Sequence, residues 1–142
     1  MKSARTCLGQ DQNDFYCVGM HWFGIPQYPG KGYWGFSFWN PQKQFRWIDV
    51  TPDGAAQWKK EIERREWSFV SSPPMSLEEA VAIAQRSLGP QKELFLSGAG
   101  LDAKTYFRIQ FFATGAKDYT NLYVTFDGKV FRNEHDVPGV GQ

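Results

Sequence analysis

The stretch that decides the fold covers residues 33–50 and reads YWGFSFWNPQKQFRWIDV. Side chains alternate along its first part, which places Phe36 and Phe38 on one face of a strand and Tyr33 and Trp39 on the other. The residues NPQKQ are typical of a turn, and FRWIDV returns as a second strand. The stretch therefore predicts an antiparallel β-hairpin with aromatic side chains on both faces.

The residues on either side extend this hairpin into a larger element. Before it, FYCVGMHWF at residues 15–23 has the composition of another strand. After it, residues 51–69 predict a helix, because Thr51 can act as the N-cap and Pro52 suits the first helical position. The first half of the chain is therefore expected to contain three strands followed by a helix.

The second half opens with SLEEAVAIAQRSLG at residues 76–89, which predicts a second helix. Ser76 and Glu79 have the spacing of a capping box, and Gly89 stands where a C-terminal cap is expected. Four strand patterns follow, and Asp127-Gly128 predicts a two-residue turn between the last two of them. These patterns read ELFLSG, TYFRIQFFA, YTNLYVTF and KVFRN.

The predicted fold class is therefore α+β, with antiparallel β-sheet and two helices in the order βββα-αββββ. A chain of 142 residues fits one domain over residues 14–142, preceded by a polar arm at residues 1–13. Two packed subdomains, at residues 14–71 and 76–134, are the alternative organisation.

Charge and hydropathy limit the classes of partner. The formal net charge of +1 argues against nucleic acid as a partner, because nucleic-acid binding usually requires a basic face. The sequence contains no apolar run long enough for a membrane helix, so we expect no membrane partner. As written, the chain carries no signal peptide and is expected in the cytoplasm, or outside it if a leader has been removed. Cys7 and Cys17 could form a disulfide or remain two thiols.

Catalytic and metal-binding patterns are weak. Cys17 and His21, with an aspartate such as Asp11, Asp14 or Asp49, would supply the groups of a thiol nucleophile. On a regular strand Cys17 and His21 share a face but lie roughly 13 Å apart, too far for proton transfer. The two histidines are too widely spaced for a local zinc site. We therefore expect no enzyme activity, no metal and no cofactor.

Aromatic content is the unusual feature, at 17% of the chain. Two slim helices cannot cover so many rings, and an antiparallel sheet usually leaves one face to solvent. We therefore predict partner-contacting surfaces, although a core role for the hairpin and a plain solvated face for the C-terminal strands stay open. The predicted contact residues are Tyr28, Tyr33, Trp39 and Arg46 around the hairpin, and Tyr106, Arg108 and Tyr123 on the C-terminal strands.

Residues 76–132 resemble a PepSY-type domain. The resemblance is carried by the opening helix SLEEAVAIAQRSLG, the strand YFRIQFF and the closing hairpin LYVTFDGKVFR. It implies a non-enzymatic domain that binds or restrains peptidases, usually outside the cytoplasm. Residues 1–75 share no such resemblance.

The expected function is non-catalytic binding of another protein, as an inhibitor, immunity factor or regulator, with homo-oligomer formation left open. One alternative is a small-ligand pocket between the hairpin and the first helix, lined by Trp47 and Trp58. The other is stacking of single-stranded nucleic acid on the C-terminal strands.

Overall fold

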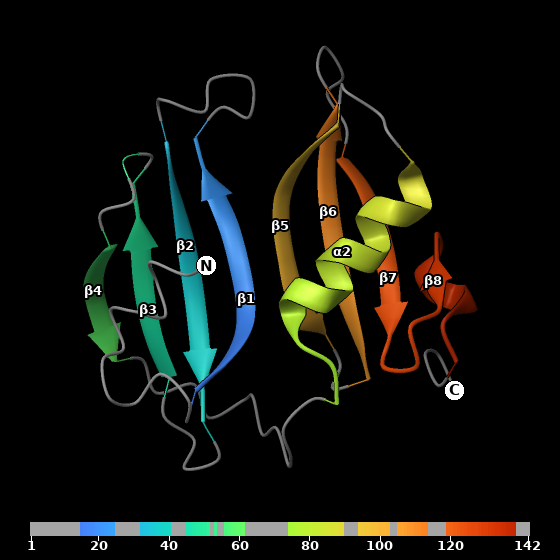
Figure 1. The fold of residues 1–142 in the computed structure, drawn as a ribbon, viewed down its shortest axis with the longest axis horizontal. Helices are drawn as coiled ribbons and strands as arrows, with labels where there is room; N and C mark the ends of the chain where they lie inside the picture. The colour runs from blue at the N-terminus through green and yellow to red at the C-terminus, as the bar shows by residue number, and fades with distance from the viewer. Residues whose placement is uncertain are drawn as a thin grey trace. The chain divides into compact units, whose positions relative to one another are not determined.

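The chain forms two compact units, Met1–Ser72 and Pro73–Gln142, each built on antiparallel strands (Figure 1). Within these ranges, the predicted arm at residues 1–13, together with Cys7 and Tyr28, lies outside the described residues. No helix in the described part of the chain is long and apolar enough to cross a membrane. The computed structural model describes residues 15–24, 32–40, 45–51, 53, 56–61, 74–89, 94–102, 105–113 and 119–138.

The first unit is a meander of antiparallel strands in the order β4-β3-β2-β1. Strands β2 and β3 are the two arms of the hairpin predicted over residues 33–50, with Phe36 opposite Ile48. That prediction is confirmed. The strands are β1 (Tyr16–Phe23), β2 (Tyr33–Trp39), β3 (Phe45–Val50) and β4 (Ala56–Glu61).

The prediction of a helix from Thr51 is wrong over residues 56–61, which form strand β4 instead. Val50 lies opposite Ala56, so the chain turns back on β3 immediately after the hairpin. The Thr51 hydroxyl donates to the Asp53 carboxylate within this turn rather than capping a helix. Thr and Asp bond locally in turns as readily as at helix N-caps, so the TPDG signal fits both structures. Residues 62–71 lie outside the described residues.

The two faces of the first sheet carry different residues. Phe36, Phe38 and Ile48 lie on one face and are between 0% and 2% exposed, so they form core. Tyr33 and Trp39 lie on the opposite face, as the alternation predicted, and we call it the Tyr33 face.

The second unit places helix α2 (Leu77–Leu88) across an antiparallel sheet in the order β5-β6-β7-β8 (Figure 1). The fold is therefore α+β, but the described residues contain one α-helix rather than the two predicted. The other elements are β5 (Leu94–Asp102), β6 (Tyr106–Ala113), β7 (Tyr119–Thr125), β8 (Val130–Phe131) and the short 3₁₀ helix η3 (Glu134–Asp136).

Helix α2 begins and ends as the sequence indicates. The backbone N–H of Glu79 donates to Ser76 Oγ over 3.1 Å, which confirms Ser76 as the N-cap. Gly89 has a φ of 74° and its N–H donates to the Arg86 carbonyl over 3.2 Å. The buried helix residues Leu77 and Ala80 cover one face of the sheet.

The face under α2 carries the fully buried Phe107, Ile109 and Leu122. The other face carries Tyr106 and the exposed Arg108 on the same strand, so it cannot be the helix-covered side. We call this second side the Tyr106 face.

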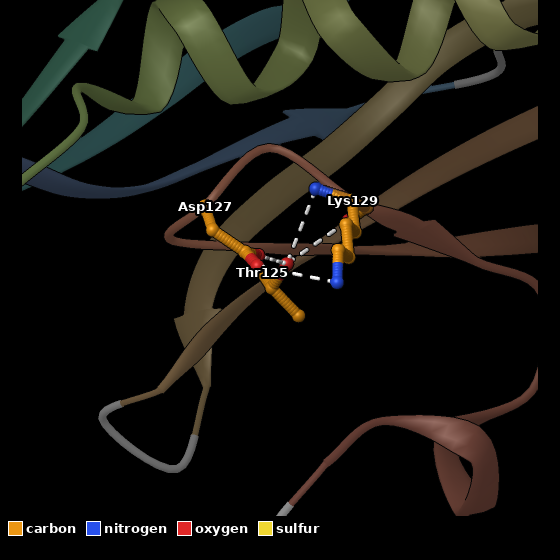
Figure 2. Close-up of polar contacts among 3 residues, drawn as sticks. All are labelled: Thr125, Asp127 and Lys129. Atoms are coloured by element: carbon orange, nitrogen blue, oxygen red, sulfur yellow. Dashed lines mark hydrogen bonds and ion pairs between the residues drawn. The ribbon is translucent and has the colours of Figure 1, made fainter.

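The β7–β8 connection, of which Figure 2 draws Thr125, Asp127 and Lys129, differs by one residue from the predicted turn. The Gly128 N–H donates to the Thr125 carbonyl over 2.9 Å, which makes Phe126 and Asp127 the central residues of the turn. Gly128 follows with a φ of 84°, and the Thr125 N–H donates to the Lys129 carbonyl over 2.9 Å. This is a three-residue hairpin loop, in which glycine supplies the left-handed position.

Candidate functional site

Four aromatic side chains gather at one end of the Tyr33 face. His21 and Phe23 come from β1, Tyr33 from β2 and Trp47 from β3. We call these four residues the Tyr33 cluster. They meet because Phe23 lies directly opposite Tyr33 at the end where β1 finishes and β2 begins.

The rings of the cluster are in contact with one another. Phe23 and Tyr33 are stacked with 5.0 Å between ring centroids and 18° between ring planes. His21 meets Phe23 edge-on at 4.8 Å, and Trp47 meets Phe23 edge-on at 5.9 Å. Such pairs each contribute about 0.5–1.5 kcal/mol beyond their buried area. The rings pack against one another and form a platform. They are not spaced apart in the way that an aromatic ligand-binding site would require.

Gly35 allows the platform to form. Phe23 and Trp47 belong to strands on either side of β2, about 9.5 Å apart. They meet over Gly35, where an added Cβ would lie 2.8 Å from Phe23 Cε2 and inside contact distance of Trp47 Cζ2. Glycine at this strand position is therefore required for close approach of the two rings.

A buried carboxylate fixes the Trp47 indole. Asp49 lies opposite Gly35 on the same face and is 7% exposed. Trp47 Nε1 donates to Asp49 Oδ1 over 2.6 Å. This hydrogen bond ties the indole to β3 and holds it over Gly35.

Tyr33 is the most solvent-accessible large apolar side chain of the cluster, at 37% exposure. Phe23 and Trp47 are half-buried, and His21 is exposed. Phe23 stacks against one face of the Tyr33 ring. The platform thus presents the Tyr33 and His21 side chains to solvent.

The other residues predicted around the hairpin lie elsewhere. Trp39 shares the Tyr33 face but lies at its far end, opposite Tyr16, and is only 1% exposed. The prediction of Trp39 as an exposed anchor is therefore wrong, because that end of the face is covered. Arg46 is half-buried on the opposite face, with its guanidinium carbon 4.3 Å from the Phe15 ring centroid. It packs within the unit as a cation–π partner, contrary to the expected exposed contact.

The predicted surface on the C-terminal strands is largely covered. Tyr106 is 1% exposed and Tyr123 is 8% exposed, and both pack against Val137. Tyr106 Oη also donates to Glu134 Oε1 over 2.5 Å. The tail that follows β8 therefore buries this tyrosine pair, which corrects the expectation of a solvent-facing surface. Arg108 is exposed as predicted.

An aromatic row that the sequence reasoning missed crosses the far end of the Tyr106 face. Phe95, Phe112 and Tyr119 lie opposite one another on β5, β6 and β7. Phe95 is 38% exposed and Tyr119 is 49% exposed, with 5.3 Å between the Phe112 and Tyr119 ring centroids. The signal was available in the alternation of β6, which places Phe112 on the same face as Arg108.

The thiol pair Cys17–His21 does not assemble. The register of β1 shifts between Cys17 and Gly19, so Cys17 lies opposite Phe38 while His21 lies opposite Gly35 on the other face. The expectation that both share a face is wrong because a bulge reverses the alternation. Cys17 is buried, and its Sγ donates to the Gly19 carbonyl over 3.4 Å. Among the residues the structure describes, no group of three or more His, Cys, Asp or Glu side chains could hold a metal ion.

The pocket predicted between the hairpin and the first helix does not form as expected, because residues 56–61 are a strand. Trp58 belongs to strand β4 and lies opposite Ile48, whereas Trp47 lies opposite Lys60. The helix that would have closed the pocket starts neither at Thr51 nor within residues 56–61. Trp47 belongs to the Tyr33 cluster instead.

No protein-family model matches this sequence, and searches of curated proteins and of solved structures found no match either. The Tyr33 cluster is therefore interpreted from its own geometry.

Proposed function

We propose that the chain is a non-catalytic protein-binding module of an inhibitory, immunity or regulatory kind, with the Tyr33 cluster as its contact surface. The observation that carries this proposal is the exposure of Tyr33, which is 37% exposed as a residue while its ring is stacked on Phe23. Tyrosine and tryptophan rings are enriched at protein interfaces and among the residues that contribute most to affinity.

The rigidity of the cluster supports the same conclusion. Ring contacts with Phe23 and the hydrogen bond from Trp47 to Asp49 hold the side chains before a partner arrives. A surface fixed in this way loses little side-chain entropy on binding. Its flatness suits a protein surface better than a small ligand, since small ligands usually bind in enclosed pockets.

The second unit adds a supporting argument for a restraining role. Its helix precedes its antiparallel strands, which is the order implied by the resemblance of residues 76–132 to PepSY-type domains. We therefore extend the proposal to a partner enzyme, such as a peptidase, whose activity the chain would restrain.

The test compares two exposed tyrosines, one from each unit. Wild-type protein, Tyr33→Ser and the matched control Tyr119→Ser are immobilised and incubated with a native lysate. The proteins that each form retains are then identified by mass spectrometry. We expect one protein to be retained by wild type and Tyr119→Ser, with at least about tenfold weaker binding to Tyr33→Ser. Equal retention by all three forms, or a bound species that nuclease removes, would overturn the proposal.

A further inference from the structure

We infer that the tyrosine pair Tyr106–Tyr123 is a second interaction surface, which the chain's own C-terminal segment occupies and which a partner of matching chemistry can take over. We call residues Glu134–Val137 the strap. This inference concerns the second unit and is independent of the function proposed for the Tyr33 cluster.

The surface under the strap is aromatic and pre-arranged. Tyr106 and Tyr123 meet edge-on with 5.8 Å between ring centroids, and Phe131 packs beside them. The same face continues along β6 to the exposed Arg108 and to Phe112 in the aromatic row. Displacement of the strap would therefore join the buried tyrosine pair to aromatic surface that is already exposed.

Glu134 and Val137 of the strap both contact this face. The Glu134 carboxylate accepts a hydrogen bond of 2.5 Å from Tyr106 Oη, and Val137 is 2% exposed against both tyrosines. The side chains of His135 and Asp136 are exposed.

Two backbone donors of the strap bond within its own turn rather than to the sheet. The Asp136 N–H bonds to the Asn133 carbonyl and the Val137 N–H to the Glu134 carbonyl, each over 3.1 Å. Glu134–Asp136 form a single 3₁₀ turn of exposed residues, and such a turn belongs to the part of a fold that opens at low free energy. The strap therefore behaves as a docked peptide rather than as another strand.

The docked strap shows what chemistry the surface accepts. A tyrosine hydroxyl binds a carboxylate, and the edge-on tyrosine pair with Phe131 receives a branched aliphatic side chain three residues later. We infer that the partner is a peptide segment presenting an acidic residue followed at that spacing by valine or a similar residue. The strap and the partner segment compete for one site.

A labelled peptide with the sequence RNEHDVP, copied from residues 132–138, tests this competition by fluorescence anisotropy. Wild-type protein should bind it weakly, because only molecules with an open strap are competent. Full-length Val137→Ala should bind it about tenfold more tightly, and Glu134→Gln should also bind more tightly, since each opens the strap. Asp136→Asn is the matched control in the strap and should leave the affinity unchanged.

A peptide in which serine replaces the valine should bind none of these proteins. Equal peptide affinity for wild type and both opened variants would overturn the inference, as would equal binding of the serine peptide. Hydrogen exchange of α2 supplies the folding control. Loss of amide protection in α2 of the opened variants would show that the strap is part of the core of the unit, which also overturns the inference. None of these outcomes bears on the Tyr33 cluster, which lies in the other unit.

Discussion

The two units treat a similar aromatic face in opposite ways. In the first unit, the Tyr33 face ends in a platform in which Tyr33 stays 37% exposed. In the second unit, the Tyr106 face carries a comparable pair of rings, but the segment after β8 covers them. Both faces have the same alternating pattern in sequence. The difference shows that alternation fixes which side chains share a face, whereas chain segments outside the strands decide which face meets solvent.

The largest effect should separate the two ends of the Tyr33 face. We expect Trp39→Ala to lower the free energy of unfolding by about 3–5 kcal/mol, because it empties a fully buried site. Tyr33→Ala should cost about 1 kcal/mol, the value of its stacking on Phe23. Urea denaturation followed by circular dichroism measures both. Equal losses for the two variants would mean that the face is uniformly covered or uniformly open.

The next effect concerns the platform itself. We expect Gly35→Ala to cost about 1–3 kcal/mol, because its Cβ overlaps Trp47 and forces the rings apart. Ser37→Ala, on the same strand and face, is the matched control and should change stability little. Denaturation monitored by tryptophan fluorescence follows both stability and the setting of Trp47. An unchanged emission and midpoint in Gly35→Ala would contradict the close approach over Gly35.

A smaller effect on stability tests the hydrogen bond through which the strap covers the Tyr106 face. We expect Tyr106→Phe to lower stability by about 1 kcal/mol, since it removes the hydrogen bond to Glu134 and keeps the ring. The same substitution in a Glu134→Gln background should cost much less, because the partner is already altered. Thermal unfolding of the four proteins gives the coupling energy. Full additivity would show that the two groups do not interact.

The smallest effect lies in the turn that leads to β8 and the strap. The hydrogen bond from the Thr125 hydroxyl, helped by Lys129, lowers the pKa of Asp127 below its ordinary value of 3.8 (Figure 2). A lowered pKa in the folded state means that ionised Asp127 stabilises the fold above the unfolded pKa. This contribution is lost as pH falls through the folded pKa.

The change should be slight, because the Asp127 side chain is 62% exposed. Urea midpoints measured from neutral pH to below 3.8 compare wild type with Asp127→Asn, which should lose less stability on acidification. A steeper acid loss in Asp127→Asn would reverse the assigned direction.

Strand pairing and helix ends were predictable because their signals are local. The alternation in residues 33–39 placed Tyr33 and Trp39 on one face, and Ser76 marked the start of α2. The TPDG sequence after Val50 was ambiguous because its hydrogen-bonding side chains suit a turn and an N-cap equally well. A bulge in β1 between Cys17 and Gly19 separated Cys17 from His21, and the glycine inside this strand pattern was the signal that could have indicated it.

The exposure of the candidate sites was not predictable in the same way. Tyr106 is covered by Val137, which lies 31 positions later in the sequence and in a tail without a strand pattern. The platform depends on Gly35 leaving space between Phe23 and Trp47, a contact across two strand spacings. Each of these contacts joins residues that are distant in sequence or on non-adjacent strands. Neither contact can therefore be predicted until the fold is known.

Hydroxyl-radical footprinting with mass spectrometry measures the central contrast directly, because it labels tyrosine and tryptophan rings according to their solvent access. We predict strong labelling of Tyr33 and much weaker labelling of Trp39, Tyr106 and Tyr123. Protection of Tyr33 to the level of Trp39 in the isolated protein would contradict an open aromatic platform on the first unit.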